Sequence, residues 1–302
     1  MTSNRKSVLF AISAILLWST VGTAFKISLR HLNYAQLLLF ASLTSMIFLL
    51  GFILVNGQFK LIRTTTRRQL GYSALLGFLN PFAYYLILFK AYSLLKAQEA
   101  VALNYIWPMM LVLLSIPILK QKIRFTSVIA LLISFSGAII IATQGKPFAL
   151  DFSEPLGVAL ALSSAIFWAL FWLLNIRDHR EESLKLFMNF LFGFAYTLIY
   201  CFATGNIVIP ELNGAMGAVY VGLFEMGITF VFWLKALKYA ENTARVSNLV
   251  YLSPFISLMF ITLILGERIL PSTLMGLVLI VTGIILQQFI AVRNKRINKT
   301  PG

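Results

Sequence analysis

Ten runs of about 20 mostly apolar residues follow one another along the chain, separated only by short polar connectors. An α-helix of that length crosses the roughly 30 Å hydrocarbon core of a bilayer. Of the 302 residues 59% are hydrophobic and 12% are charged, too few charges for the surface of a soluble protein. The sequence therefore predicts an all-α integral membrane protein with ten transmembrane helices, at residues 7–28, 34–55, 70–92, 97–119, 125–143, 156–176, 184–204, 214–237, 243–266 and 271–291.

Basic residues are distributed unevenly between the connectors. When the connectors are assigned alternately to two sides, 19 of the 25 Lys and Arg residues fall on the side of the N-terminus. Cytoplasmic loops carry such an excess, so the pattern predicts an even number of spans with both termini in the cytoplasm, in a bacterial inner (plasma) membrane. Orientation and attraction to lipid account for the net charge of +15, so nucleic acid is not an expected partner.

The chain repeats itself at a shift of 146 residues. This shift superposes Tyr105 on Tyr251, Pro108 on Pro254 and Gly137 on Gly283. The repeat divides the chain into residues 1–146, with helices one to five, and residues 147–302, with helices six to ten and a basic tail. Because each half has an odd number of helices, the second half is inserted upside down relative to the first. Inverted repeats of this kind are typical of secondary transporters, which bind substrate near the midplane and work by alternating access.

Two prolines interrupt apolar spans at their midpoints. Pro108 lies in the middle of 97–119 and Pro254 in the middle of 243–266, so the carbonyls of Asn104 and Val250 lose their helical partners. Free polar backbone at this depth is tolerated where it is buried in protein or lines a cavity. A simple packing kink is the alternative. The occurrence of the same kink in both halves, beside an intramembrane Asn, favours a cavity wall.

Glu225 is the most costly residue in the sequence, because it lies near the middle of span 214–237. It is predicted to bind a substrate ammonium group or to take up a proton, with Thr229 on the same helix face. The alternative is a protonated Glu bonded to the backbone of a neighbouring helix. Glu99 is instead expected to form an interfacial ion pair with Lys96. Gly276 and Gly283 predict a close helix contact, either within a monomer or across a homodimer.

Aromatic residues well inside the spans suggest a cavity that offers stacking and hydrogen bonds to an organic solute. The predicted cavity set is Trp18, Tyr84, Tyr85, Asn104, Tyr105, Trp107, Trp168, Glu225 and Tyr251. No metal or cofactor is expected, because Cys201 is the single cysteine and His31 and His179 are predicted on opposite sides of the membrane. A membrane-embedded enzyme is a remote alternative, since Asp151 and Asp178 both lie in connectors.

The second half resembles the EamA family of the drug/metabolite transporter superfamily. The likeness is carried by "VFWLKAL" (231–237), Pro254, the Gly266-Glu267-Arg268 turn and Gly283, and it covers essentially the whole chain. Within that family, "LLWST" (16–20), "NYIWP" (104–108) and the surroundings of Trp168 are similar to the aromatic amino-acid exporter branch. The resemblance implies a cavity lined from helices one, three, four and six by Trp18, Tyr84 or Tyr85, Tyr105, Trp107 and Trp168.

The resemblance implies a ten-helix carrier for small molecules in a lipid bilayer. The expected substrates are amino acids, aromatic or large and neutral, or similar amphipathic metabolites, and the expected direction is export. Glu225 has no counterpart that could be carried over from the exporter branch. The alternative is therefore an importer or exchanger of a charged metabolite such as S-adenosylmethionine.

Overall fold

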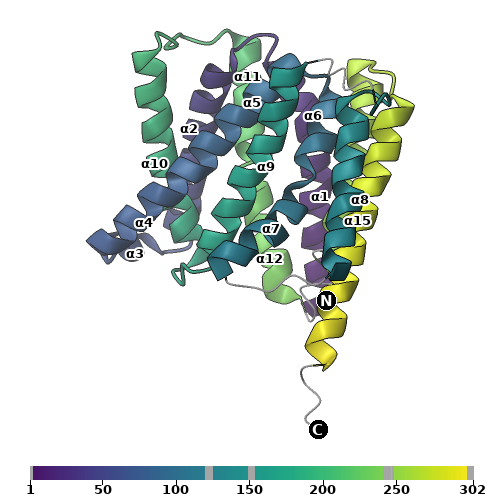
Figure 1. Ribbon diagram of the computed structural model, residues 1–302. Coiled ribbons are helices and arrows are strands. Elements are labelled where there is room, and N and C mark those ends of the chain that lie inside the picture. Colours follow the sequence, from purple (N-terminus) through teal and green to yellow (C-terminus); the bar gives the residue numbers. More distant parts are fainter. Residues whose placement is uncertain (1–2, 120–124, 149–153, 241–245, 247, 298–302) are drawn as a thin grey trace.

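The computed structural model describes residues 3–119, 125–148, 154–240, 246 and 248–297, and this part of the chain contains helices but no strand (Figure 1). Within these described residues, seven helices are long and apolar enough to cross a membrane, and three shorter apolar helices cover 128–142, 249–265 and 271–287. The predicted all-α, multi-pass membrane architecture is confirmed. The first residues of span 243–266 and the Lys120-Gln121-Lys122 connector lie outside the described residues.

The first half of the chain contains α1 (Ser3–Ser28), α2 (Tyr34–Val55), α3 (Phe59–Arg63), α4 (Arg67–Gly77), the π-helical segment η1 (Phe78–Ala83), α5 (Tyr84–Leu94), α6 (Ala97–Asn104), α7 (Trp107–Leu119) and α8 (Phe125–Ala142). The second half contains α9 (Pro155–Asn175), α10 (Glu182–Ala203), α11 (Leu212–Phe224), α12 (Ile228–Tyr239), the 3-10 segment η2 (Asn248–Leu252), α14 (Ser253–Phe260), the π-helical segment η3 (Ile261–Leu265) and α15 (Pro271–Ile297). The start of α1 and the end of α15 lie at the same end of the bundle (Figure 1).

Two spans are interrupted where a proline was expected to act. The span 97–119 is divided into α6 and α7 by a turn at Tyr105 and Ile106, so Pro108 lies in the first turn of a new helix. Pro254 likewise lies in the first turn of α14, after η2. A proline is well tolerated there because the first N–H groups of a helix have no partner within it.

Two further interruptions were not predicted. Span 70–92 breaks at Asn80, which has extended backbone angles (φ −151°, ψ 119°) and precedes Pro81. Span 214–237 ends its first helix at Phe224 and starts the next at Ile228, with Gly227 non-helical (φ −106°, ψ −89°). The expectation that Thr229 continues the helix face of Glu225 is therefore wrong. The Thr229 hydroxyl donates instead to the Phe224 carbonyl, at the broken end of α11.

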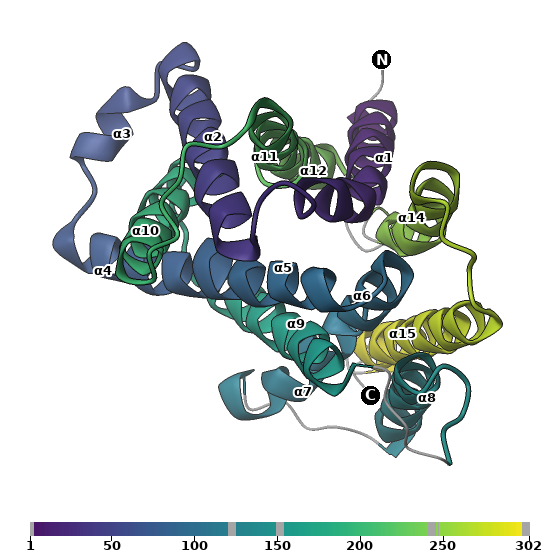
Figure 2. The same cartoon turned by 90° about the horizontal axis from the view of Figure 1, so that it is seen from above.

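The helices form two flanks around a central group. Seen from above, α3, α4 and α10 lie on one flank and α8 and α15 on the other, with α5 and α9 between them (Figure 2). The backbones of α8 and α15 are so close that a Cβ on Gly137 would lie 2.4 Å from the Gly276 carbonyl, and a Cβ on Gly283 would lie 2.5 Å from the Ala130 carbonyl. The close contact expected for Gly276 and Gly283 is thus made within the chain.

Candidate functional site

A pocket of about 420 Å³ lies among the central helices and is lined from both halves of the chain. In the first half α1, α5, α6 and α7 contribute, and in the second α9, the α11–α12 break, α12, η2 and α14. The residues of the predicted set that line it are Trp18, Tyr84, Asn104, Tyr105, Trp107, Trp168, Glu225 and Tyr251. Further lining side chains that the sequence analysis did not select include Phe25, Tyr92, Trp172, Trp233 and Ser253.

Trp168 is the centre of the aromatic wall of this pocket. Its ring centroid lies 4.7 Å from that of Tyr84, 6.4 Å from that of Trp107 and 5.7 Å from that of Trp172. These four rings come from α5, α7 and α9 and stand at inclined angles to one another, the geometry that aromatic pairs prefer. A second pair, Trp18 of α1 and Trp233 of α12, has its centroids 5.4 Å apart. The pocket therefore presents both ring faces and ring edges to a ligand.

The broken end of α6 supplies polar groups to the same wall. The Asn104 side-chain amide donates to the Ser164 hydroxyl at 2.9 Å, and its carbonyl oxygen accepts from the Tyr84 hydroxyl at 3.4 Å. The Tyr105 hydroxyl donates to the backbone carbonyl of Val250 at 3.0 Å. Pro254 was expected to leave the Val250 carbonyl without its helical partner. In the structure this carbonyl accepts a hydrogen bond from Tyr105, in the other half of the chain.

Glu225 lies at the α11–α12 break and is 6% exposed. The Tyr85 hydroxyl donates to its Oε1 at 3.0 Å, while Oε2 is buried and has no hydrogen-bond partner in the described part of the chain. Tyr85, predicted for the cavity together with Tyr84, is not among the residues that line this pocket: it is fully buried, and its hydroxyl holds the Glu225 carboxylate. The described structure therefore shows Glu225 accepting a hydrogen bond from a side chain and none from the backbone of a neighbouring helix.

Polar contacts close the pocket beyond Phe25 and Tyr92. Lys26 Nζ donates to the carbonyls of Tyr92 at 2.8 Å and Leu95 at 2.6 Å, at the end of α5. The Glu267 carboxylate accepts from the backbone N–H of Ala97 at 3.0 Å, at the start of α6. A carboxylate is favourable there because the first N–H groups of a helix carry partial positive charge.

Gln98 forms further hydrogen bonds between the start of α6 and the segment that follows Glu267. Its side chain donates to the Arg268 carbonyl at 2.9 Å and accepts from the Leu270 N–H at 2.8 Å, and it is fully buried. We call the group formed by Lys26, Gln98 and Glu267 the latch. Glu99 does not form the expected ion pair with Lys96 in the described structure, because its carboxylate points to Gln144 and accepts from the amide of that side chain at 2.8 Å.

The lining of the opposite end of the pocket is exposed at Ile176. This residue lies just after α9 and is 68% exposed, and the lining there also includes Leu237 near the end of α12. The end of α12 lies beside the start of α1, since the Ser7 hydroxyl donates to the Ala236 carbonyl at 2.7 Å. The exposed part of the pocket lining therefore lies toward the end of the bundle where α1 begins, and the latch lies at the other end.

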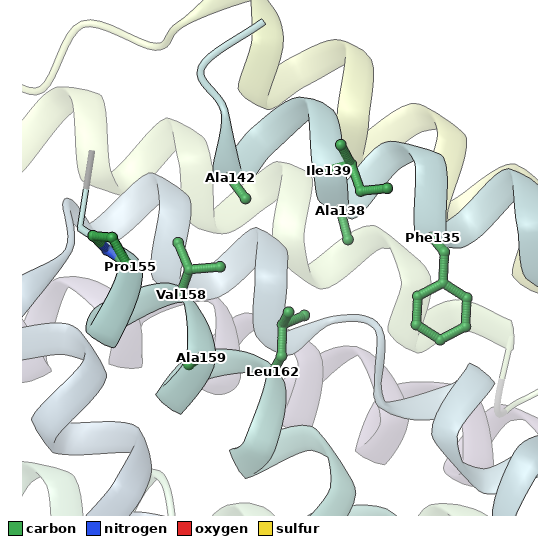
Figure 3. A pocket seen from close by; sticks show the side chains of 8 residues that line it. All are labelled: Phe135, Ala138, Ile139, Ala142, Pro155, Val158, Ala159 and Leu162. Atoms are coloured by element: carbon green, nitrogen blue, oxygen red, sulfur yellow. The ribbon is translucent and has the colours of Figure 1, made fainter. Parts of the chain in front are cut away.

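A second pocket, of about 330 Å³, lies between α8 and α9. Figure 3 shows its eight lining side chains, all of them apolar: Phe135, Ala138, Ile139 and Ala142 from α8 and Pro155, Val158, Ala159 and Leu162 from α9. None of these side chains has a hydrogen-bonding or charged group that could orient a solute. The central pocket is therefore the candidate site. Among the described residues no three His, Cys, Asp or Glu side chains lie close enough together to hold a metal ion.

Known proteins resemble this chain over most of its length. The sequence profile of the EamA-like transporter family matches residues 5–143 and 155–287. An uncharacterized transporter of Clostridium kluyveri is 26% identical over 93% of both chains, and the aromatic amino acid exporter YddG of Ancylobacter novellus is 23% identical over 84% of this chain and 87% of its own. A solved crystal structure that is 20% identical covers 96% of this chain and 99% of its own at a TM-score of 0.66, which establishes the fold.

Proposed function

We propose that this chain, which belongs to the EamA-like transporter family, uses the central pocket as its substrate site and carries a small amphipathic organic molecule across the membrane by alternating access. One observation carries the proposal: the pocket is lined by interrupted helices from both halves of the chain. Interrupted helices that meet at mid-membrane are how secondary transporters expose polar backbone and side chains to a substrate.

The positions of the interruptions support two inverted halves, residues 1–146 and 147–302. Asn80 and Glu225, at the breaks of spans three and eight, are 145 positions apart, close to the repeat of 146 that relates Pro108 to Pro254. The lining helices also correspond, since spans one, three and four of the first half match spans six, eight and nine of the second. The family profile matches the chain in two segments of similar length.

We propose amino acids with an aromatic or large neutral side chain, or similar amphipathic metabolites, as the substrates, and export as the direction. The aromatic wall around Trp168 supports this, as does the similarity to a protein named as an aromatic amino acid exporter. A second candidate is exchange of a charged metabolite such as S-adenosylmethionine. The buried carboxylate of Glu225 favours it, because a cationic group of the substrate would compensate that charge.

The test is transport by purified protein in liposomes. Vesicles loaded with unlabelled aromatic amino acids and amines are diluted into buffer that contains a labelled trace of each. The expected result is accumulation of label that is absent from protein-free vesicles and is competed by excess unlabelled compound. Absence of transport for every amino acid and amine tested would contradict the proposed substrates.

The proposed orientation is that of a bacterial inner-membrane protein with both termini in the cytoplasm. The excess of basic residues on the side of the N-terminus supports it, as does the position of the start of α1 and the end of α15 at one end of the bundle. Labelling of single cysteines in intact cells tests it. A cysteine introduced after Lys146 should react with a membrane-impermeant reagent, and one introduced after Asp178 should react only after lysis.

A further inference from the structure

We infer that the pocket selects an organic cation without a free carboxylate, an amine with an aromatic or apolar body, and that this cation and a proton compete for Glu225. The inference rests on the proposed function and narrows its substrate class. Among the amphipathic metabolites proposed above it favours amines, because aromatic amino acids and S-adenosylmethionine all carry a carboxylate as well as a positive charge. The charges that line the pocket distinguish amines from molecules with a carboxylate.

The lining residues that the structure describes include one acidic side chain, Glu225, and no Lys or Arg. One of the two Glu225 oxygens is bonded to Tyr85, and the other is buried without a hydrogen-bond partner. A buried carboxylate with an unused oxygen is costly unless a cation or a proton compensates it. An ammonium group bound at Oε2 would supply that compensation.

Lys26, which follows the lining residue Phe25 on α1, is not available to a substrate carboxylate. Its Nζ is bonded to the carbonyls of Tyr92 and Leu95 at the latch, and it does not line the pocket. Lys235, on α12, lies instead over the rings of Phe10 and Phe52. A zwitterion would therefore bring a carboxylate into the same pocket as Glu225 with no positive side chain from the described residues beside it, and two like charges at low dielectric repel strongly.

The aromatic wall is suited to a positive charge. Faces of Trp and Tyr rings attract ammonium and quaternary ammonium groups, and the attraction increases where water is excluded. Trp168 lies at the centre of that wall, with Tyr84 and Trp107 beside it. One carboxylate together with several electron-rich rings is an environment for a cation, whereas an anion would meet the negative faces of the same rings.

Competition with protons follows from the charge of Glu225, because a protonated carboxyl group no longer attracts an ammonium ion. The other titratable groups that face the pocket are tyrosines: Tyr84 and Tyr92 from α5, Tyr105 from the α6–α7 turn and Tyr251 from η2, with Tyr85 behind the carboxylate. Tyrosines titrate near pH 10 in water and are neutral in the acidic and neutral range. Amine affinity should therefore fall as the pH falls, in proportion to the protonated fraction of Glu225.

The test uses four ligands that share one phenyl ring: phenylalaninamide and 2-phenylethylamine, which are cations, phenylalanine, which is a zwitterion, and 3-phenylpropionate, which is an anion. Affinities are measured by calorimetry on purified protein at several pH values. The expected result is that both cations bind at least tenfold more tightly than phenylalanine, which corresponds to about 1.4 kcal/mol. The anion should bind most weakly. Cation binding should weaken on acidification.

Two variants assign the effect to the carboxylate. Glu225→Gln should lower the affinity for 2-phenylethylamine, which stays cationic through the acidic and neutral range, at least tenfold and abolish its pH dependence there. Glu154→Gln, at an exposed residue at the start of α9 without a capping hydrogen bond, should leave both unchanged. If the Glu225→Gln variant does not fold, the relative affinities of the wild-type protein for phenylalaninamide and phenylalanine still test the inference. Phenylalanine binding as tightly as its amide would overturn this inference alone, whereas failure of all four ligands to bind would count against the proposed function itself.

Discussion

Tyr85 and Glu225 are 140 positions apart in the chain, and the Tyr85 hydroxyl donates a hydrogen bond to the Glu225 carboxylate at 3.0 Å. Tyr85 is fully buried and Glu225 is 6% exposed, so both side chains are largely shielded from bulk water. The bond connects span three of the first half to span eight of the second. It holds one carboxylate oxygen in place, while the other is buried and has no hydrogen-bond partner in the described structure.

Replacing Tyr85 by Phe should lower the affinity for the transported amine about tenfold and leave the fold intact. The ring keeps its packing, but the carboxylate loses a hydrogen bond to a charged group, worth roughly 1.5–3 kcal/mol. Calorimetry with 2-phenylethylamine measures the effect. Tyr72→Phe is the matched control, since the Tyr72 hydroxyl donates to the Leu174 carbonyl away from the pocket. An equal loss of affinity in both variants would contradict a specific role for Tyr85.

Replacing Trp168 by Ala should weaken substrate binding by more than tenfold, because Trp168 contacts the rings of Tyr84, Trp107 and Trp172. Trp168→Phe should retain part of the affinity, since a smaller ring keeps some stacking. Competition binding with a labelled substrate measures both. Phe202→Ala is the control, because Phe202 is 78% exposed on α10. The pocket assignment would be wrong if Trp168→Ala bound substrate as the wild type does.

Replacing Glu267 by Ala should open the closed end of the pocket more often. The change leaves the N–H groups of Ala97 and Gln98 at the start of α6 without their carboxylate partner. The reporter is a Val101→Cys side chain, which lines the pocket, in a Cys201→Ala background. Its reaction with an impermeant thiol reagent added on the latch side should become severalfold faster. Glu211→Ala is the control, since Glu211 forms no capping hydrogen bond, and equal rates in the two variants would refute the latch.

Asp178 should make stability depend on pH in the acidic range. Burial alone would raise the pKa of the Asp178 carboxyl, but the hydrogen bonds and charge of Arg180 hold that pKa below its ordinary value. A lowered pKa means that the ionised carboxylate stabilises the fold above about pH 4, the value for an unfolded Asp, and that this contribution is lost as the pH falls through the folded value. Thermal unfolding in detergent between pH 3 and pH 7 measures it.

Asp178→Ala should cost about 3 kcal/mol and remove this pH dependence. The Asp178 and Arg180 side chains are 5% and 7% exposed and 2.6 Å apart, so the change leaves a buried guanidinium without its partner. Glu182→Ala is the control, because Glu182 pairs with Lys185 at 2.8 Å but is 48% exposed, and such pairs contribute about 1 kcal/mol or less. Similar losses in the two variants would show that burial of the Asp178 pair has no special effect.

Gly276→Ala should destabilise the protein by about 1–3 kcal/mol, because an added Cβ would lie 2.5 Å from the Gly137 carbonyl on α8. Gly51→Ala, in α2, should be neutral or stabilising, since nothing lies within 4 Å of its added Cβ and Ala is the better helix former. Apparent melting temperatures in the same detergent compare the two. A smaller loss for Gly276→Ala than for Gly51→Ala would show that α8 and α15 are not in this close contact.

The membrane architecture could be predicted because its cause is local: a span must be apolar over its own length. The helix interruptions at Asn80 and at Glu225–Gly227 were missed, since both segments remain apolar overall. Pro81 offered the same signal as Pro108 and could have indicated the first of them. No proline marks the second interruption, which lies at Gly227, a residue with non-helical backbone angles.

The candidate site was predicted as a group of residues but not in its arrangement. Tyr84 and Tyr85 are adjacent on a helix, where neighbouring side chains point about 100° apart, so only one can face the pocket. Nothing in the sequence decides which of the two tyrosines faces the pocket. The latch could not be predicted from local sequence patterns either, because Glu267 and Ala97, which it brings together, are 170 positions apart in the chain. Long-range pairs of this kind depend on how the helices pack.

The closed end of the pocket also has an electrical consequence. In the proposed carrier, solution that fills the pocket would leave the latch, with Lys26 bonded to the Tyr92 carbonyl and Glu267 to the Ala97 N–H, as the layer across which most of the membrane potential falls. A charge that crosses this layer experiences most of the transmembrane voltage, about 2.3 kcal/mol for each 100 mV. A cation leaving alone would be strongly opposed by a negative interior. One-for-one exchange with a proton would cancel that cost, so the proposed sharing of a single carboxylate by cation and proton would make transport insensitive to voltage.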